Sequence, residues 1–206
     1  GTEMPGDLLE MLLAGLEISQ SEVQVIEGTL DLSVALQVAN LPRPELRAPR
    51  WQPVTPARIT ASTSADAPNG DMFKVIAEGD LLVHHPYDSF EASVDRLFAQ
   101  AADDPDVLSI RSTLYRTGAT SSIPAHLIRA AQAGKEVVVL VELKARFDEA
   151  ANIEWARRLE EAGAHVVYGV MGLKTHCKAT LIARREGAGI RRYVHLSTGN
   201  YNPKTA

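Results

Sequence analysis

The chain has 206 residues, of which 45% are hydrophobic and 23% charged, and its formal net charge at pH 7 is -5. This composition is typical of a globular protein of one or two domains, and the negative charge excludes a chain-wide attraction to nucleic acid or to an anionic membrane. Any anion site must therefore be local. The single cysteine, Cys177, excludes an internal disulfide and favours a reducing compartment. No apolar run reaches the length of a membrane span, and the N-terminus lacks the features of a signal peptide.

The N-terminal segment predicts short helices and then a linker. Leucines recur at helical spacing over residues 7–18, and two shorter apolar stretches follow before residue 40. Six prolines between residues 42 and 68 then break any periodicity, which indicates a linker or an extended surface arm. We therefore expect residues 1–60 to form the end of a helical domain and a proline-rich linker, and residues 61–206 to form a second domain.

The second domain alternates expected strands with expected helices, which predicts the α/β class. The helices are expected over residues 71–78, 89–102, 121–134 and 149–162. The strands are expected over residues 81–84, 107–115, 136–143, 164–168, 176–185 and 190–197, the last two joined by a hairpin turn. The run from Val137 to Val141 is evenly apolar, as in a strand that is buried on both faces of a parallel sheet. We expect a mainly parallel sheet flanked by helices and preceded by a small helical segment.

Polar residues follow several of these strands, at the sheet edge where α/β proteins bind ligands. Arg116 and Arg146 follow two strands, Lys174 and His176 follow a third, and Asn200 follows a fourth. The planar guanidinium of arginine can contact two phosphate oxygens at once. The sequence therefore predicts an anion site at this edge, although either arginine alone would be read as a surface ion pair.

The stretch from Gly172 to Lys178 contains an H-x-K motif. His176 and Lys178 are two residues apart, so on an extended backbone both side chains point to one face. A neutral imidazole can attack phosphorus while a neighbouring lysine holds the phosphate oxygens, and Lys174 adds positive charge. An isolated H-x-K motif also fits an ordinary basic strand edge. Cys177 points to the opposite face and is expected to be a buried small residue rather than a catalytic thiol.

Longer blocks of sequence resemble the bacterial polyphosphate kinase 1 family. These blocks, in chain order, cover residues 84–90, 113–118, 141–149, 152–153, 172–178 and 195–202. The catalytic half of this family is similar in fold to phospholipase D, so the resemblance implies a phospholipase D-like sheet. Because the chains of the family are considerably longer, it also implies that this chain is a fragment. We expect it to carry the end of the helical domain and most of the first catalytic domain, and to be inactive alone.

The resemblance assigns roles to the candidate residues. His176 matches the histidine that becomes phosphorylated, and His195 matches a second histidine that is important for activity. Arg116 and Arg146 match arginines that hold the phosphates of nucleotide or polyphosphate together with magnesium, without being conventional metal ligands. The remaining phosphate-binding candidates are Lys174, Lys178 and Asn200.

The implied reaction is reversible transfer of the terminal phosphate of ATP to polyphosphate through a phosphohistidine. Its partners are ATP or ADP and inorganic polyphosphate, with Mg²⁺ accompanying ATP and with no nucleic acid. The resemblance further implies a homo-oligomeric full-length enzyme that is cytoplasmic, or membrane-associated as part of a complex. One departure concerns Ala183, which stands where phospholipase D-type motifs carry an aspartate. It argues against the first alternative, a phospholipase D-like phosphodiesterase or nuclease. The second alternative is a non-catalytic polyanion-binding module.

Other polar groups have simpler interpretations. His126 and His165 are expected to be structural or exposed, whereas His84 and His85 either line the site or support it. The arginine pairs at 184–185 and 191–192 flank the hairpin turn and are expected to be solvated, with guidance of a polyanion as the alternative.

Overall fold

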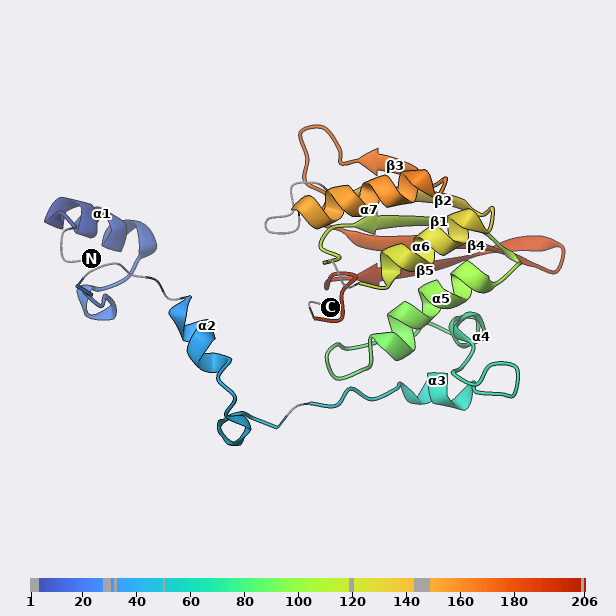
Figure 1. The fold of residues 1–206 in the computed structure, drawn as a ribbon, viewed down its shortest axis with the longest axis horizontal. Helices are drawn as coiled ribbons and strands as arrows, with labels where there is room; N and C mark the ends of the chain where they lie inside the picture. Colours follow the sequence, from blue (N-terminus) through green and yellow to red (C-terminus); the bar gives the residue numbers. More distant parts are fainter. Residues whose placement is uncertain are drawn as a thin grey trace. The chain divides into compact units, whose positions relative to one another are not determined.

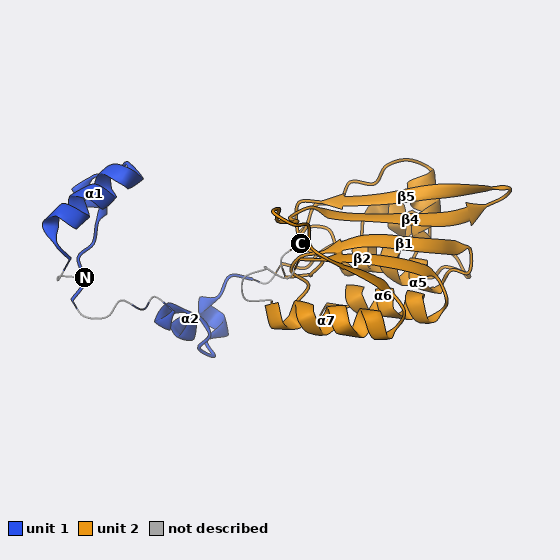
Figure 2. Ribbon diagram, turned by 90° about the horizontal axis from the view of Figure 1, so that it is seen from above, with its two compact units in different colours: residues 1–50 blue, residues 51–206 orange. Residues whose placement is uncertain are grey.

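The computed structural model describes residues 4–27, 31, 33–49, 51–118, 121–142, 149–204 and 206. The chain divides into two compact units, residues 1–50 and 51–206 (Figure 2). The first unit contains the helices α1 (Gly6–Leu16) and α2 (Val34–Ala39) and the short 3₁₀ turns η1 (Gln20–Glu22) and η2 (Pro44–Leu46). Its described elements bury no side chain, so the hydrophobic core belongs to the second unit.

The boundary between the units lies between residues 50 and 51, earlier than the position near residue 60 that the prolines suggested. The helix α3 (Ala57–Ala61) places Ile59 in the core with no exposed surface. The guanidinium of Arg58 donates hydrogen bonds to the carbonyls of Val75 and Asp80 at 2.5 and 2.6 Å. Residues 51–60 therefore belong to the second unit, because proline restricts the backbone without preventing burial of its neighbours.

Two helical segments of the second unit begin at a side chain that caps their first turn. In α4 (Met72–Ala77) the carboxylate of Asp71 accepts a hydrogen bond from the N–H of Lys74. The Ser89 hydroxyl accepts from the N–H of Ala92, ahead of a π-helical turn η3 (Glu91–Asp95) that continues into α5 (Arg96–Asp103). The remaining helices are α6 (Ile123–Gln132) and α7 (Glu149–Glu161). Asp148, the residue immediately before α7, lies outside the described residues.

Five strands form one sheet in the order β3-β2-β1-β4-β5 (Figure 1). Their bounds are β1 (Val107–Leu114), β2 (Glu136–Val141), β3 (His165–Tyr168), β4 (Lys178–Glu186) and β5 (Gly189–Ser197). β1 pairs in parallel with β2, and β2 with β3, whereas β4 is antiparallel to both β1 and β5. The sheet is thus mixed, and β1, β2, β3 and β5 run in one direction. The α/β prediction is confirmed.

The helices α5, α6 and α7 lie together against one face of this sheet (Figures 1 and 2). Alternate residues of β2 are buried beneath them, whereas Val138 and Leu140 on the other face are only partly buried. The expectation that this strand is buried on both faces is therefore wrong, because the described helices of this unit cover one face only. Residues 81–84 form no strand either, and Leu82 is 92% exposed.

Four strands that run in the same direction end at the same edge of the sheet, and β4 begins there. The candidate residues that the structure describes lie at or near this edge. None of the helices formed by the described residues combines the length and the apolar character needed to cross a membrane.

Candidate functional site

The ring of Tyr115 is the centre of the described part of this edge. Tyr115 directly follows β1 and is 7% exposed. Four of the candidate residues surround it. The imidazole of His176 meets the ring edge-to-face with 4.8 Å between centroids. The cationic groups of Lys178, Lys174 and Arg116 lie 4.7, 5.4 and 5.5 Å from the ring centroid.

His176 and Lys178 contact each other directly. The ammonium nitrogen of Lys178 lies 3.3 Å from both ring nitrogens of His176. His176 is exposed, whereas Lys178 is only 3% exposed. Burial lowers the pKa of the Lys178 ammonium; a smaller effect of Cys177 opposes this shift, and a still smaller effect of the Arg116 charge adds to it. The site therefore places an accessible imidazole beside a cation held in a poorly solvated position.

The H-x-K segment is attached to the ends of two strands. The hydroxyl of Thr113, in β1, donates to the carbonyl of Cys177 at 2.7 Å and accepts from the N–H of Ala179 at 3.0 Å. The carboxylate of Glu142, just after β2, accepts a hydrogen bond from the N–H of Thr175 at 2.8 Å. The backbone on both sides of His176 is thus fixed to the sheet. Cys177 is exposed, so its predicted burial is wrong.

The side chain of Asn152 connects the ends of the strands β1 and β2. Its side chain comes from α7 and is 1% exposed, and Nδ2 donates to the carbonyls of Tyr115 and Glu142 at 2.7 and 3.0 Å. Asn152 was assigned no role from the sequence alone. The available signal was its helical spacing with Trp155 and Leu159, which placed an amide on the buried face of this helix. Such a buried amide must find hydrogen-bond partners.

The turn after β1 requires glycine at position 118. Gly118 has a φ of +64°, and an added Cβ would lie 2.6 Å from Nδ2 of Asn202. This Nδ2 donates to the carbonyl of Thr117 at 2.9 Å, and the indole N–H of Trp155 donates to the carbonyl of Gly118 at 3.1 Å. A side chain at position 118 would therefore combine backbone strain with a steric clash. The turn is held from two directions, which fixes the backbone that follows Arg116.

His195 belongs to a chain of buried hydroxyl groups. Its Nδ1 is hydrogen-bonded to the hydroxyl of Tyr201 at 3.0 Å. That hydroxyl is 2.7 Å from Oγ1 of Thr180, which is 2.7 Å from the hydroxyl of Ser112. Strand register explains this arrangement, because Ser112, Thr180 and His195 are direct neighbours across β1, β4 and β5. Since Lys178 and Thr180 are two residues apart in β4, this hydroxyl chain lies on the same face as Lys178.

Burial of His195 lowers its pKa to about 4, with a smaller contribution from the charge of His85. His195 is therefore neutral near pH 7. Between pH 6.5 and 4 the unfolded chain binds a proton at this residue and the folded chain does not, so stability is lost as the pH falls through this range.

We predict that acidification from pH 6.5 to 4 costs up to about 3 kcal/mol of unfolding free energy through His195. Urea unfolding at a series of pH values measures this loss. The His195→Gln variant, which cannot titrate at this position, is the control, and its stability should fall less steeply. Parallel pH profiles for the two proteins would contradict the assignment.

The remaining predicted phosphate-binding residues are Asn200 and Arg146. Asn200 lies in the turn after β5, where its carbonyl accepts from the N–H of Asn202 at 2.8 Å. Arg146 lies outside the described residues.

The Nδ1 of His85 is 2.9 Å from the carbonyl of Asp88, and because a carbonyl only accepts, this nitrogen carries the proton. Together with its electrostatic effect on His195, this places His85 in a supporting position.

Three of the four arginines near the hairpin are paired with carboxylates. Arg184 contacts Asp104 at 2.8 Å, Arg185 contacts Asp106 at 3.7 Å, and Arg191 contacts a Glu186 oxygen at 3.5 Å. These ion pairs neutralise much of the local positive charge, which argues against guidance of a polyanion. His126 is likewise structural, because its Nε2 lies 3.0 Å from the carboxylate of Asp95.

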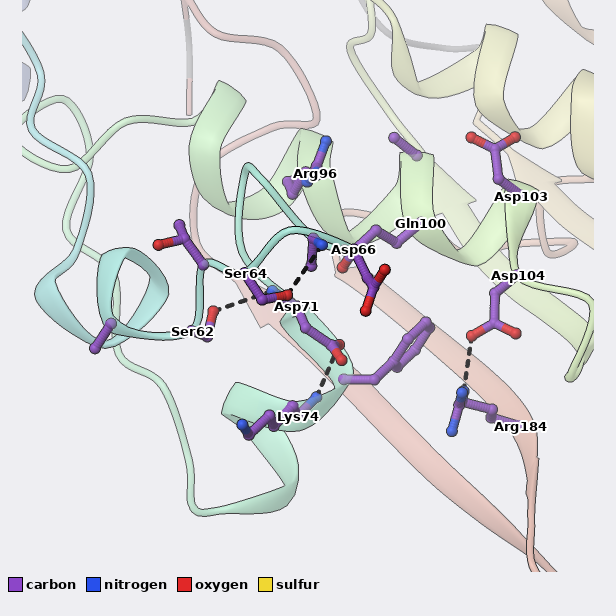
Figure 3. Close-up of a pocket in the computed structure, with 15 residues that line it drawn as sticks. Ser62, Ser64, Asp66, Asp71, Lys74, Arg96, Gln100, Asp103, Asp104 and Arg184 are labelled. Atoms are coloured by element: carbon purple, nitrogen blue, oxygen red, sulfur yellow. Dashed lines mark hydrogen bonds and ion pairs between the residues drawn. The ribbon is translucent and has the colours of Figure 1, made fainter.

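A cavity of about 670 Å³ lies away from the Tyr115 ring, between residues 61–74 and α5 (Figure 3). Its walls carry charges of both signs, including Asp71, Lys74 and the Arg184–Asp104 ion pair. Gln100 of α5 is hydrogen-bonded to the facing segment: its side chain accepts from the N–H of Met72 and donates to the carbonyl of Gly70, both at 2.8 Å. We interpret this cavity as a gap between packed segments rather than a binding site. Its walls carry both positive and negative charges and would not attract a ligand of either charge.

The described residues contain no group of three or more His, Cys, Asp and Glu side chains that could hold a metal ion. The cluster around Tyr115 is instead a set of nitrogen donors. It fits the oxygens of a phosphate, to which lysine and arginine donate charge-assisted hydrogen bonds.

Comparison with known proteins shows what this chain is similar to. Residues 71–206 match the family described as polyphosphate kinase C-terminal domain 1. The polyphosphate kinase of Mycolicibacterium gilvum is 54% identical over 204 residues, which are 99% of this chain and 27% of that protein. The polyphosphate kinase of Streptomyces coelicolor is 52% identical over 97% of this chain and 26% of that protein. A solved polyphosphate kinase from Porphyromonas gingivalis superposes with a TM-score of 0.67 at 34% identity, over 100% of this chain and 31% of that one. The chain thus spans about a quarter of the length of these curated relatives.

Proposed function

Since this chain belongs to the polyphosphate kinase family, we propose that it forms part of an ATP:polyphosphate phosphotransferase in which His176 carries the phosphoryl group. One observation carries this proposal. The exposed imidazole of His176 lies beside the buried ammonium of Lys178, 3.3 Å from both ring nitrogens, and next to the cations Lys174 and Arg116. A nucleophile surrounded by cations is the arrangement that phosphoryl transfer requires.

The transfer takes place in two steps. In the first, the lone pair of the unprotonated ring nitrogen of His176 forms a P–N bond, the P–O bond to the leaving nucleotide breaks, and ADP departs. In the second, a terminal oxygen of polyphosphate attacks the phosphohistidine, the P–N bond breaks, and its electron pair returns to the ring. Lys178, Lys174 and Arg116 hold the non-bridging oxygens, where charge is spread in the loose transition state.

Mg²⁺ belongs to this proposal as a companion of ATP. The charged groups around the Tyr115 ring, Lys178, Lys174 and Arg116, are cations, which attract phosphate oxygens and repel a metal ion. The metal therefore enters on the phosphates of the nucleotide, where it neutralises part of their charge. Arg116 would hold phosphate oxygens of this complex, and Arg146 would do the same under the role that the family resemblance implies. Oligomeric state and cellular location stay predictions.

The test uses γ-³²P-labelled ATP and two samples, this chain and a full-length polyphosphate kinase that carries the same sequence. In the full-length protein we expect an acid-labile, base-stable label and elongation of polyphosphate. The chain alone should bind polyphosphate weakly, with an affinity that falls as salt rises, and should not elongate it, because positioning of ATP supplies much of the rate.

Other outcomes would favour the alternatives. Hydrolysis of a phosphodiester such as bis(p-nitrophenyl) phosphate by the full-length protein, without labelling, would favour the phosphodiesterase. Polyphosphate binding by the full-length protein with neither labelling nor hydrolysis would favour a non-catalytic module. Efficient elongation by residues 1–206 alone would show that the chain contains a complete site.

A further inference from the structure

We propose that Tyr115 is a positioning residue whose ring gathers the cations of the site and sets the orientation of the His176 imidazole. This inference rests on the proposed function. Its basis is the convergence of four groups on one ring, namely His176 at 4.8 Å and three cationic groups at 4.7 to 5.5 Å from the centroid. These distances are within the range of about 6 Å over which a cation is attracted to an aromatic face.

An aromatic ring suits this task better than a carboxylate would. Lys174, Lys178 and Arg116 carry like charges that repel one another in the absence of a phosphate. A carboxylate would overcome this repulsion, but it would also occupy the N–H donors and compete with the phosphate. The ring attracts the cations through its electron-rich face and forms no hydrogen bond with them. The ring therefore holds the ammonium groups of Lys174 and Lys178 nearby without itself accepting their N–H donors.

The same ring orients the nucleophile. The planes of Tyr115 and His176 make an angle of 66°, an edge-to-face arrangement that aromatic pairs favour. The ammonium of Lys178 contacts both rings, at 4.7 Å from the Tyr115 centroid and 3.3 Å from the nitrogens of His176. Movement of the tyrosine ring would therefore disturb the imidazole and its neighbouring cation together.

Tyr115 is itself firmly held. Its carbonyl accepts the 2.7 Å hydrogen bond from Asn152, and its side chain is 7% exposed at the end of a central strand. A positioning residue needs this rigid support if it is to hold other groups within a fraction of an ångström.

The experiment uses the 206-residue chain and two probes. Calorimetry with inorganic tripolyphosphate measures binding to the cations. Phosphoramidate, a small phosphoryl donor that releases ammonia, measures the nucleophilicity of His176, and ³¹P NMR follows formation of phosphohistidine. The variants are Tyr115→Phe, Tyr115→Leu and Tyr115 replaced by pentafluorophenylalanine, which keeps a ring of similar shape but reverses its electrostatic character. Tyr193→Leu is the matched control, since this buried tyrosine also lies under an arginine but far along β5.

We expect Tyr115→Phe to stay within about two-fold of the parent protein in both measurements, because the ring is kept. Tyr115→Leu and the fluorinated ring should each weaken tripolyphosphate binding about ten-fold or more and slow phosphorylation by at least as much. Tyr193→Leu should lose stability without change in either measurement. If Tyr115→Leu does not fold, the comparison between Tyr115→Phe and the pentafluorophenylalanine variant still tests whether the electron-rich face of the ring is needed.

Two results would overturn the inference. Binding and phosphorylation by the fluorinated variant that equal those of Tyr115→Phe would show that the ring has only a packing role. If Tyr115→Phe weakens tripolyphosphate binding and slows phosphorylation as much as Tyr115→Leu does, the effect belongs to the hydroxyl and not to the ring. Ring-dependent binding of tripolyphosphate with no phosphorylation of His176 in the parent chain would support the gathering of cations and would count against His176 as the nucleophile in the proposed function.

Discussion

Replacing His176 by alanine is expected to abolish phosphoenzyme formation in a full-length polyphosphate kinase that carries this sequence. The imidazole supplies the lone pair that forms the P–N bond, and the adjacent Lys178, a protonated amine in a cationic cluster, cannot replace it. Labelling with γ-³²P ATP, followed by acid and base treatment, measures the loss. Transfer to polyphosphate should fall by several orders of magnitude, because the two-step route has no other carrier.

The control for this prediction is His165→Ala. His165 is an exposed histidine at the start of β3, at the opposite end of that strand from the site edge. Its removal should leave labelling unchanged. Added imidazole offers a second check, since a free ring in the space left by His176→Ala could accept phosphate and restore part of the activity. Base-stable label of normal amount in His176→Ala would place the phosphoryl group on another residue.

The sequence predicted the strands of the sheet better than their surroundings. Apolar runs marked β1 to β5, and Gly and Ser residues marked helix ends, because these are local signals. The run Leu81–His84 was read as a strand and is not one. Leu81 and Val83 instead line an apolar cavity of about 320 Å³ with Val194 and Leu196 of β5. A short apolar run indicates that some of its side chains are partly buried, but not whether the backbone pairs.

Much of the candidate site followed from a topological rule. Because strands that run in one direction end at one edge, Arg116, Lys174 and His176 were expected together before any distance was known. Tyr115 and Asn152 were given no role, since an aromatic residue at a strand end and an amide in a helix look like ordinary core and surface positions in a single sequence. Their importance comes from contacts between segments far apart in the chain, which local patterns do not contain.

Replacing Lys178 by methionine is expected to lower the rate of phosphoryl transfer by about 10² to 10³-fold, the usual effect of removing one preorganised donor. Methionine has a similar length and no charge, so the packing around Tyr115 is largely kept. The lowered pKa of Lys178 shows that burial of its charged ammonium is unfavourable. We therefore expect the variant to have at least the same free energy of unfolding in urea as the parent. A loss of transfer without loss of stability separates a role in the reaction from a structural one.

The control is Lys174→Met, which removes an exposed ammonium at 5.4 Å from the same ring. Its effect should be smaller and should disappear at high salt, since solvent and ions screen an exposed charge more than a buried one. The pH dependence gives a further distinction. Lys178 loses its charge as the pH rises through its lowered pKa, so phosphate binding by the parent protein should decline at a pH below that expected for an ordinary lysine. This alkaline decline should be absent from Lys178→Met and present in Lys174→Met. An unchanged decline in Lys178→Met would show that another group titrates, and Lys178 would then be a structural cation.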